Sequence, residues 1–424
     1  MNSRTVAYEI LLKIEKDKAY SNLTLDKELK DSNLNSLDKA LASRIVYGVL
    51  ERKLTLDYAL NRYIKSGIKK LKADVRTVLR MGAYQILFMD KIPESAAVNE
   101  SVKIIKKKAQ YASGMVNGVL RNIARNGFEY PDEKDTINYY SIKYSCPVFL
   151  LEMWFEYLGQ EDTVKLLEHS LRAPPLYVRV NTLKTNADDL TARLEGKGIT
   201  AEKTYIDNCL RLHGIADVSH LKEYKEGLFY VQDISSQICA ETLGAKAGDT
   251  VFDMCCAPGG KTFTISQCME NKGEIKAFDI YDSRLKLVSD SAKRLGIDIV
   301  NVRNQDATES DSSLGTADKI LCDVPCSGLG IIRRKPEIKY KDKAELDSLP
   351  EIQYKILCNA SGYLKPSGVL VYSTCTLNPK ENEDVCEKFL KENPTFEKDG
   401  EYRRLLPQND LSDGFFIAKF RKGE

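Results

Sequence analysis

The 424-residue sequence predicts a multidomain protein with an all-α N-terminal domain, a small α+β module, and an α/β Rossmann-like domain built on a doubly wound sheet. Three observations predict this fold class. Apolar residues recur at helical spacing early in the chain, strand-like runs are scarce before about residue 130, and strands alternate with helices after about residue 225. A chain of this length can give each domain its own core. We therefore expect domains at 1–127, 128–218 and 219–424.

The first domain is predicted to be helical and basic. Val6, Ile10 and Ile14 are spaced by four residues, which places them on one face of a helix. Residues 1–127 contain 24 Lys and Arg but 13 Asp and Glu, a surplus of +11 that leaves −9 for the rest of a chain whose net charge is +2. This uneven distribution favours a polyanion such as nucleic acid as the partner, although any single run of lysines is often a solvated helix face.

Two stretches of this domain, Ala97 to Val102 and Val116 to Ile123, resemble the all-helical NusB family of RNA-binding domains. The resemblance implies RNA binding and assigns no individual contact.

The second module begins with a polar linker at 128–135, followed by a helix at 147–158 that holds Trp154, which we expect in the core. A strand at 177–181, a helix at 187–195 capped by Asn186 and a strand at 209–212 complete it. Two polar strand residues, Arg179 and Asn181, are equally consistent with RNA contact and with an ordinary surface position.

The third domain is predicted to be a doubly wound sheet. Its strand-like runs lie at 250–253, 274–279, 299–303, 319–323 and 368–373. Helical or loop segments separate these runs, which is typical of a parallel sheet. Ligands of such sheets bind at the carboxyl ends of the strands.

A glycine turn follows the first of these strands. It consists of Cys255, Cys256, Ala257, Pro258, Gly259, Gly260 and Lys261. The tripeptide Gly260 to Thr262 imitates the end of a phosphate-binding P-loop, but that motif requires glycine at position 255, which is cysteine. The dinucleotide fingerprint is absent as well. A tight turn before a helix then favours a nucleoside over a triphosphate.

Carboxylates at the strand ends complete a predicted adenosine pocket. Asp253 precedes the turn, Asp279 is placed to accept hydrogen bonds from ribose hydroxyls, and Asp306 is placed to accept one from the adenine amino group. Acids near the turn can also pair with the amino group of a methionine moiety. We therefore predict S-adenosyl-L-methionine as the cofactor, bound by the turn together with Asp279, Asp306 and Asp323.

Two cysteines follow strand ends in the same domain. Cys326 follows the strand at 319–323 and Cys375 follows the strand at 368–373, so neighbouring parallel strands would bring both thiols into one crevice. A thiolate that adds to C6 of cytosine allows C5 to attack the methyl group of S-adenosylmethionine. We predict Cys375 as the nucleophile, because a helix is expected to start at Pro379, with Cys326 assisting and Asp323 sharing a proton with N3.

The second half of the chain resembles the Sun family of RNA cytosine-C5 methyltransferases. The segments that carry this resemblance are Gln232 to Ser236, Cys255 to Thr262, Asp323 to Gly328, Arg333 to Ile338 and Tyr372 to Glu383. The resemblance implies that Cys375 is the nucleophile and that Cys326 resolves the covalent adduct. Together with the NusB-like domain, it implies an enzyme acting on small-subunit ribosomal RNA, at cytosine 967 of 16S ribosomal RNA in the customary numbering.

This sequence departs from the family pattern at three positions. Cys256 and Val324 stand where alanine is common, and Thr376 stands where serine is common. None of these changes removes a reactive group. Cys256 at the turn is better explained as a small packed residue than as a third catalytic thiol.

Two other functions remain open from the sequence. One keeps the cofactor but makes Cys326 the nucleophile, as in DNA cytosine methyltransferases, and the other is an RNA-binding assembly factor with an inactive methyltransferase domain. The eleven cysteines form no Cys-x-x-Cys pair and adjoin no histidine, so we expect neither disulfides nor a metal. Without a signal peptide or a long apolar run, we expect a cytoplasmic monomer with no membrane partner.

Overall fold

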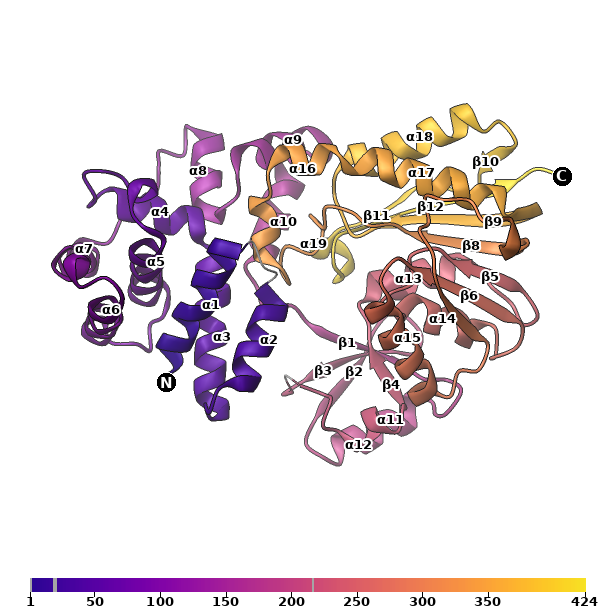
Figure 1. Ribbon diagram of the computed structural model, residues 1–424, viewed down its shortest axis with the longest axis horizontal. Coiled ribbons are helices and arrows are strands. Elements are labelled where there is room, and N and C mark those ends of the chain that lie inside the picture. The colour runs from indigo at the N-terminus through magenta and orange to yellow at the C-terminus, as the bar shows by residue number, and fades with distance from the viewer. Residues whose placement is uncertain (1, 18–20, 216) are drawn as a thin grey trace. The chain divides into compact units, whose positions relative to one another are not determined.

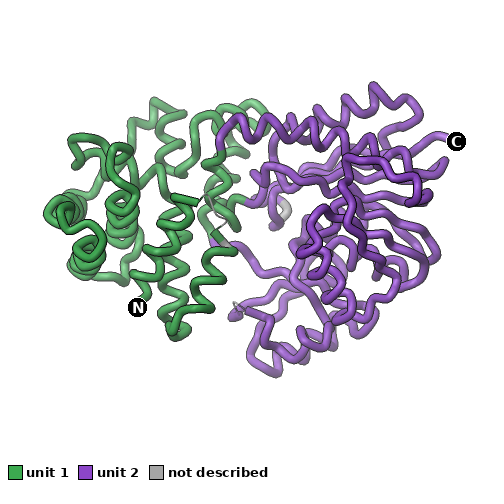
Figure 2. Tube along the Cα trace, in the orientation of Figure 1, with its two compact units in different colours: residues 1–172, 332–341 green, residues 173–331, 342–424 purple. Residues whose placement is uncertain are grey.

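The structure is a computed structural model that describes residues 2–17, 21–215 and 217–424 (Figure 1). These residues form two compact units (Figure 2). Unit 1 comprises residues 1–172 and 332–341, and unit 2 comprises residues 173–331 and 342–424. The second segment of unit 1 therefore lies between two stretches of unit 2 in the sequence.

The described residues of unit 1 are helical, as predicted for residues 1–127. Its helices are α1 (Ser3–Asp17), α2 (Ser21–Asp31), α3 (Ser36–Glu51), α4 (Lys53–Asn61), α5 (Ala73–Phe88), α6 (Glu94–Lys108), α7 (Ser113–Asn126), α8 (Thr136–Tyr144), α9 (Val148–Leu158) and α10 (Gln160–Ser170), with short 3₁₀ turns η1 (Ile68–Lys70) and η2 (Gln110–Ala112). Val6, Ile10 and Ile14 are buried in one apolar core with residues of α3, α5, α6 and α7. Trp154 of α9 is fully buried, as predicted. The four-residue apolar spacing thus marks the faces that form this core.

The segment 332–341 packs among these helices through the 3₁₀ turn η4 (Pro336–Tyr340). The carboxylate of Glu337 accepts hydrogen bonds from the backbone N–H and the hydroxyl of Ser21, the first residue of α2. A carboxylate at a helix N-terminus satisfies a free N–H and opposes the positive end of the helix dipole. Lys339 is 1% exposed and donates to the backbone carbonyls of Glu51 and Tyr144, and burial lowers the pKa of Lys339 to about 8. The segment is therefore an integral part of unit 1.

Unit 2 contains a small antiparallel sheet in the order β2-β3-β1-β4. Its elements are β1 (Leu176–Val180), α11 (Ala187–Glu195), β2 (Thr200–Lys203), β3 (Cys209–His213), α12 (Lys222–Lys225) and β4 (Phe229–Val231). The side chain of Asn186 accepts a hydrogen bond from the N–H of Asp189, which confirms the predicted cap of α11.

Both sequence-based interpretations of Arg179 and Asn181 are wrong. The two residues are 4% and 0% exposed, so they are neither surface residues nor placed to touch RNA. Arg179 pairs with Glu241, and the amide of Asn181 donates to the carbonyls of Gly227 and Leu295. The reason is that other elements of unit 2 cover the face of the sheet to which these side chains point, and Arg179 also hydrogen-bonds to Gln237 and Gln267 there.

The large sheet of unit 2 has the order β10-β12-β9-β8-β5-β6-β7, with β11 paired to β12. Its strands are β5 (Thr250–Asp253), β6 (Glu274–Asp279), β7 (Val300–Asn304), β8 (Ala317–Asp323), β9 (Leu364–Thr374), β10 (Phe396–Lys398), β11 (Arg403–Leu405) and β12 (Phe415–Lys422), and its helical segments are α13 (Ile234–Thr242), α14 (Gly260–Cys268), α15 (Asp282–Leu295), η3 (Ser312–Leu314), α16 (Lys343–Asp347), α17 (Leu349–Gly362), η5 (Pro379–Glu381), α18 (Glu383–Glu392) and α19 (Pro407–Asp410). The five strands β5 to β9 are parallel, while β12 is antiparallel to β9. Because β5 lies in the middle of the parallel strands, the chain winds in both directions from it, as predicted.

Alternate residues of the parallel strands fill two cores, one on each face of the sheet. Val251 packs with α13 and α14, whereas the next residue, Phe252, packs with α17 and α18. Leu321 and Ile320 of β8 divide in the same way. Figure 1 shows α17 and α18 on the face opposite α13 and α14. Both faces are therefore covered, and only the strand ends remain open to a ligand.

Candidate active site

The two predicted cysteines lie together at the carboxyl ends of adjacent strands. Strands β8 and β9 are parallel neighbours, and Asp323 at the end of β8 is in register with Ser373 on β9. The loops that follow bring Cys326 Sγ within 3.2 Å of Cys375 Sγ. Both residues are partly exposed. One substrate atom can therefore reach both sulfurs.

The two thiols have unequal surroundings. The hydrogen bond with Cys375 and burial of the sulfur raise the pKa of Cys326 well above its ordinary value, and the charges of Glu381 and Asp323 act in the same direction. Cys326 therefore keeps its proton at neutral pH. A thiol held at this distance from Cys375 is placed to donate a hydrogen bond to the other sulfur.

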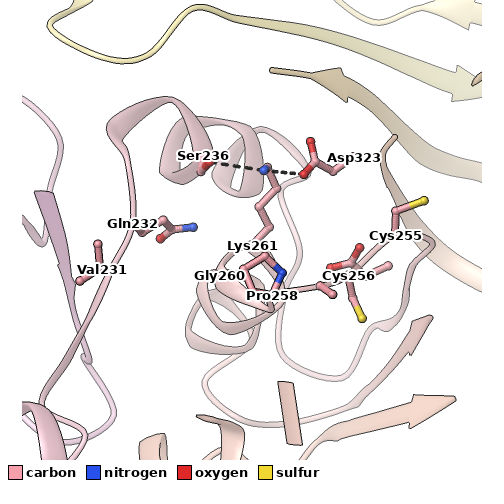
Figure 3. A pocket seen from close by; sticks show the side chains of 11 residues that line it. Val231, Gln232, Ser236, Cys255, Cys256, Pro258, Gly260, Lys261 and Asp323 are labelled. Carbon is pink, nitrogen blue, oxygen red and sulfur yellow. Dashed lines mark hydrogen bonds and ion pairs between the residues drawn. The ribbon is translucent and has the colours of Figure 1, made fainter. Parts of the chain in front are cut away.

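A lysine supplies positive charge beside these groups. Burial lowers the pKa of Lys261, but the charges of Asp323, Cys239 and Cys375 and a hydrogen bond to Asp323 raise it overall. Its ammonium group lies 2.7 Å from Asp323 Oδ2 and 3.3 Å from Ser236 Oγ (Figure 3). The second oxygen of Asp323 accepts a hydrogen bond of 2.8 Å from Ser373 Oγ. Lys261 and Ser373 thus hold Asp323 in one orientation.

The predicted helix after Cys375 starts later than expected. Residues Pro379–Glu381 form the 3₁₀ turn η5, and α18 begins only at Glu383. The α-helix expected to start at Pro379 therefore begins at Glu383, after the 3₁₀ turn. Lys261 is a further positive charge near Cys375, because the charge of Cys375 is among those that raise the pKa of Lys261.

The glycine turn connects β5 to α14. Gly259 has a φ of +104°, and a Cβ atom built on it would lie 2.4 Å from the ring of Phe263. Only glycine combines this backbone conformation with such a close approach. The turn places the first residues of α14 against a pocket lined by Val231, Gln232, Ser236, Asp253, Cys255, Cys256, Ala257, Pro258, Gly260, Lys261 and Asp323.

Two buried polar atoms in the lining of this pocket have no hydrogen-bond partner in the described part of the chain. They are Gln232 Nε2, a donor, and Asp253 Oδ1, an acceptor. The amide of Gln232 lies near the start of α14, where a Cβ atom built on Gly260 would be 3.5 Å from Gln232 Nε2 (Figure 3). Unpaired buried polar groups are costly, so such a pair indicates a ligand that carries both an acceptor and a donor. The carboxylate and amino groups of an amino acid moiety meet both requirements.

The buried position of Asp253 in this pocket changes the pKa of its carboxyl group. Burial raises the pKa of Asp253 to about 7, against the opposing hydrogen bond from Thr262. A cationic ligand group would favour its charged form.

Besides Gly259, two of the predicted cofactor residues do not line the pocket. Asp279 accepts from the N–H of Tyr281 and pairs with Arg284 at 3.1 Å. Asp306 accepts from the N–H and the hydroxyl of Thr308. Their roles toward ribose and adenine stay predictions. The other predicted cofactor residues line the pocket, apart from Gly259, which shapes the turn.

Apart from Asp253, which sequence reasoning placed before the turn without including it among the cofactor-binding residues, three pocket residues are missing from the predicted set: Val231, Gln232 and Ser236. They precede or begin α13 and adjoin no strand end of the large sheet, so the strand-end rule could not identify them. The segment Gln232 to Ser236 carried part of the family resemblance, which was the available signal.

The two cysteines of the glycine turn, Cys255 and Cys256, lack the lowered pKa that a nucleophilic thiol needs. Burial raises the pKa of Cys255 and of Cys256, and the charges of Asp253 and Asp279 raise both further. Their thiols therefore remain neutral and line the pocket as small groups.

Neither a metal cluster nor a membrane helix is found in the described ranges. Within 2–17, 21–215 and 217–424, no group of three or more His, Cys, Asp or Glu residues is arranged to hold a metal ion. Across those residues, no helix has the length and apolar character needed to span a bilayer.

Three family models match the chain. The model described as 16S rRNA methyltransferase RsmB/F matches residues 240–421, the NusB family model matches residues 1–125, and a ferredoxin-like domain of RsmF/B-like methyltransferases matches residues 146–219.

Curated relatives match the chain over nearly its whole length. The probable ribosomal RNA small subunit methyltransferase B of Bacillus subtilis is 35% identical over 99% of this chain and 98% of the relative. The corresponding probable enzyme of Synechocystis is 32% identical over 100% of both chains.

Solved structures give the same picture of the fold. The crystal structure of PH0851 has a TM-score of 0.85 at 26% identity and covers 100% of this chain and 99% of its own. The structure of NSun6 from Pyrococcus horikoshii with SFG has a TM-score of 0.61 at 26% identity and covers 66% of this chain and 98% of its own.

Proposed function

The chain belongs to the RsmB/F family of 16S ribosomal RNA methyltransferases, and we propose that it methylates C5 of a cytosine in 16S ribosomal RNA. Its cofactor is S-adenosylmethionine. The observation that carries the proposal is the pair of sulfurs 3.2 Å apart beside Asp323, which also lines the cofactor pocket. By family resemblance, the target is cytosine 967.

The chain's own residues account for how the cofactor would be held. Gln232 and Asp253 offer the carboxylate and amino groups of the methionine moiety a donor and an acceptor that otherwise lack partners. The glycine turn allows the ligand to approach the backbone closely. When bound there, S-adenosylmethionine supplies an electrophilic methyl group.

Cys375 acts as the nucleophile in the proposed reaction. Its thiolate adds to C6 of the flipped cytosine, which makes C5 nucleophilic enough to take the methyl group. Cys326 Sγ lies 3.2 Å from Cys375 Sγ, so the S–H of Cys326 can donate a hydrogen bond to the attacking sulfur. Asp323, oriented by Lys261 and Ser373, shares a proton with N3 of the base as that nitrogen gains electron density during the addition.

Cys326 assists the release of the product. Because its raised pKa keeps it protonated, its S–H can donate a hydrogen bond to the sulfur of Cys375 as that sulfur leaves C6. In the same stage the proton of C5 passes to solvent water. The electrons of the C5–H bond restore the C5–C6 double bond, and those of the C6–S bond leave with the sulfur of Cys375.

We further propose that residues 1–127 bind the RNA, residues 128–218 form the small module and residues 219–424 carry the catalysis. The three family models, which match 1–125, 146–219 and 240–421, support this division. Exposed lysines of the first domain give it a basic surface: Lys65, Lys69, Lys70, Lys72, Lys91, Lys106 and Lys107. Such a surface suits phosphate contacts.

The decisive experiment is methyl transfer from labelled S-adenosylmethionine to 16S ribosomal RNA, followed by bisulfite mapping of the product. We expect label at one cytosine, protected from bisulfite conversion only when the protein is present. Properly folded protein that binds RNA without transferring label would instead support the assembly-factor function.

A further inference from the structure

A buried carboxylate, Glu381, lies where the loops of both cysteines meet. The residue is 0% exposed, and it ends the turn η5. Both of its oxygens serve as hydrogen-bond acceptors. Oε1 accepts from the hydroxyl of Ser327 and, at 2.8 Å, from Nδ2 of Asn378. Oε2 accepts from the N–H of Ser327 at 2.8 Å and from Nε2 of Gln353 at 2.9 Å.

These four donors come from three separate segments of unit 2. Ser327 directly follows Cys326, Asn378 lies three residues after Cys375, and Gln353 is on α17. The amide of Gln353 also donates to the carbonyl of Pro325, which directly precedes Cys326. One side chain therefore connects the loop of each sulfur to a helix of the scaffold.

Other bonds fix Glu381 itself and link the same loops. The hydroxyl of Tyr372, on β9, donates to the backbone carbonyl of Glu381. The hydroxyls of Ser327 and Thr376 are 2.6 Å apart, which joins the residues that directly follow the two cysteines. Thr376 and Tyr372 thus belong to the same buried polar network.

The cost of burying a carboxylate makes this hydrogen-bond network favour one relative position of the two cysteine loops. A carboxylate without water is tolerated only when its hydrogen-bonding capacity is filled. If the loop of Cys326 moved away from the loop of Cys375, at least one oxygen of Glu381 would lose its donors. The desolvation of the acid thereby penalises any other separation of the loops.

We propose that Glu381 is the positioning residue that sets the separation of Cys326 and Cys375. The proposal rests on the proposed function, since that separation matters because one sulfur adds to cytosine and the other assists its release. Glu381 touches neither sulfur and acts through the backbone of the two loops.

The test uses a readout of the sulfur separation that needs no RNA. In the full-length protein, diamide should oxidise Cys326 and Cys375 to a disulfide, and peptide mapping by mass spectrometry gives the rate for this pair. In Glu381→Gln, one acceptor oxygen is replaced by an NH₂ group, which is a donor. That NH₂ group then faces Ser327, Asn378 or Gln353, which donate hydrogen bonds in the wild type. We expect the rate of disulfide formation to fall about tenfold or more, because the sulfurs are no longer held together.

Catalysis gives the second readout. A displacement on the order of 1 Å at a reacting group costs about 100-fold in rate, so kcat of Glu381→Gln should fall by about that factor while the affinity for S-adenosylmethionine is unchanged. Glu381→Asp keeps the charge but is one methylene shorter, so it should restore part of both rates. The matched control is Glu387→Gln on α18, an exposed acid that bonds to the hydroxyl of Tyr402 and should leave both rates unchanged.

A folded Glu381→Gln protein that forms the disulfide at the wild-type rate would overturn the proposal. If that variant does not fold, Ser327→Ala, which removes one of the two donors to Oε1, takes its place in the same comparison and decides the question. If Glu381→Gln slows disulfide formation while the wild type transfers no methyl group to RNA, the positioning role stands and the proposed function fails.

Discussion

At the scale of single residues, the two sulfurs differ in a way that assigns their order of action. Cys326 has a raised pKa and is placed to donate a hydrogen bond, whereas Cys375 lies near the charge of Lys261. We expect Cys375→Ala to abolish the covalent adduct with RNA and Cys326→Ala to accumulate it, because release then lacks its hydrogen-bond donor. Denaturing gel electrophoresis of the protein with labelled RNA measures both. Loss of the adduct in Cys326→Ala alone would make Cys326 the nucleophile, as in the DNA enzymes.

Asp253 makes the stability of the ligand-free protein depend on pH. Because burial raises its pKa from 3.8 to about 7, the folded state binds the proton more tightly than the unfolded chain. The stability that this group contributes is therefore full below about pH 4 and is lost as the pH rises to 7, by on the order of 4 kcal/mol.

Asp253→Asn cannot ionise and should lack this loss. The measurement is the free energy of unfolding in urea at pH 5 and pH 8 for both proteins without cofactor. The wild type should lose more stability than the variant between the two pH values. An equal loss in both would show that Asp253 is ionised throughout.

At the scale of elements, the turn between β5 and α14 depends on one backbone conformation. Gly259→Ala must adopt a φ of +104° and place a methyl group against Phe263. We expect a loss of about 1–3 kcal/mol in the free energy of unfolding and weaker binding of S-adenosylmethionine. Calorimetry measures the binding.

The matched control for the turn is Gly118→Ala. Gly118 is in the interior of α7, and a Cβ atom there meets nothing within 4 Å. Alanine at an open helical position stabilises by about 0.5–1 kcal/mol. Similar behaviour of the two variants would mean that the turn tolerates a side chain.

At the scale of the whole molecule, the charge of the chain is divided between its domains. If the basic first domain binds RNA, then Lys106→Gln with Lys107→Gln should weaken binding and lower the slope of log affinity against log salt by about 1 to 2, because each phosphate contact releases a counterion. Filter binding at several salt concentrations measures the slope. As a control, Lys355→Gln with Lys391→Gln, at two exposed lysines of unit 2, should leave this slope unchanged. Equal slopes in all three proteins would place the RNA contacts elsewhere.

The sequence predicted most of the order of helices and strands, because hydrophobic periodicity and the residues that end helices and strands are local properties of the chain. The strands β5 and β6 have the predicted bounds, and the start of α11 is capped as expected. The two sulfurs could be placed together because parallel neighbours end at one edge of a sheet. This rule needs only the strand pattern.

What only the tertiary structure decided depends on residues far apart in the chain. Arg179 and Asn181 are buried because other elements of unit 2 cover β1, and Glu337 caps α2 from 316 positions away. The partners of Glu381 come from three segments whose meeting no local pattern predicts. By itself, the sequence determined the fold class, the thiol pair and the glycine turn. Burial and long-range hydrogen bonds, which exist only once the chain has packed, decided how those groups are held.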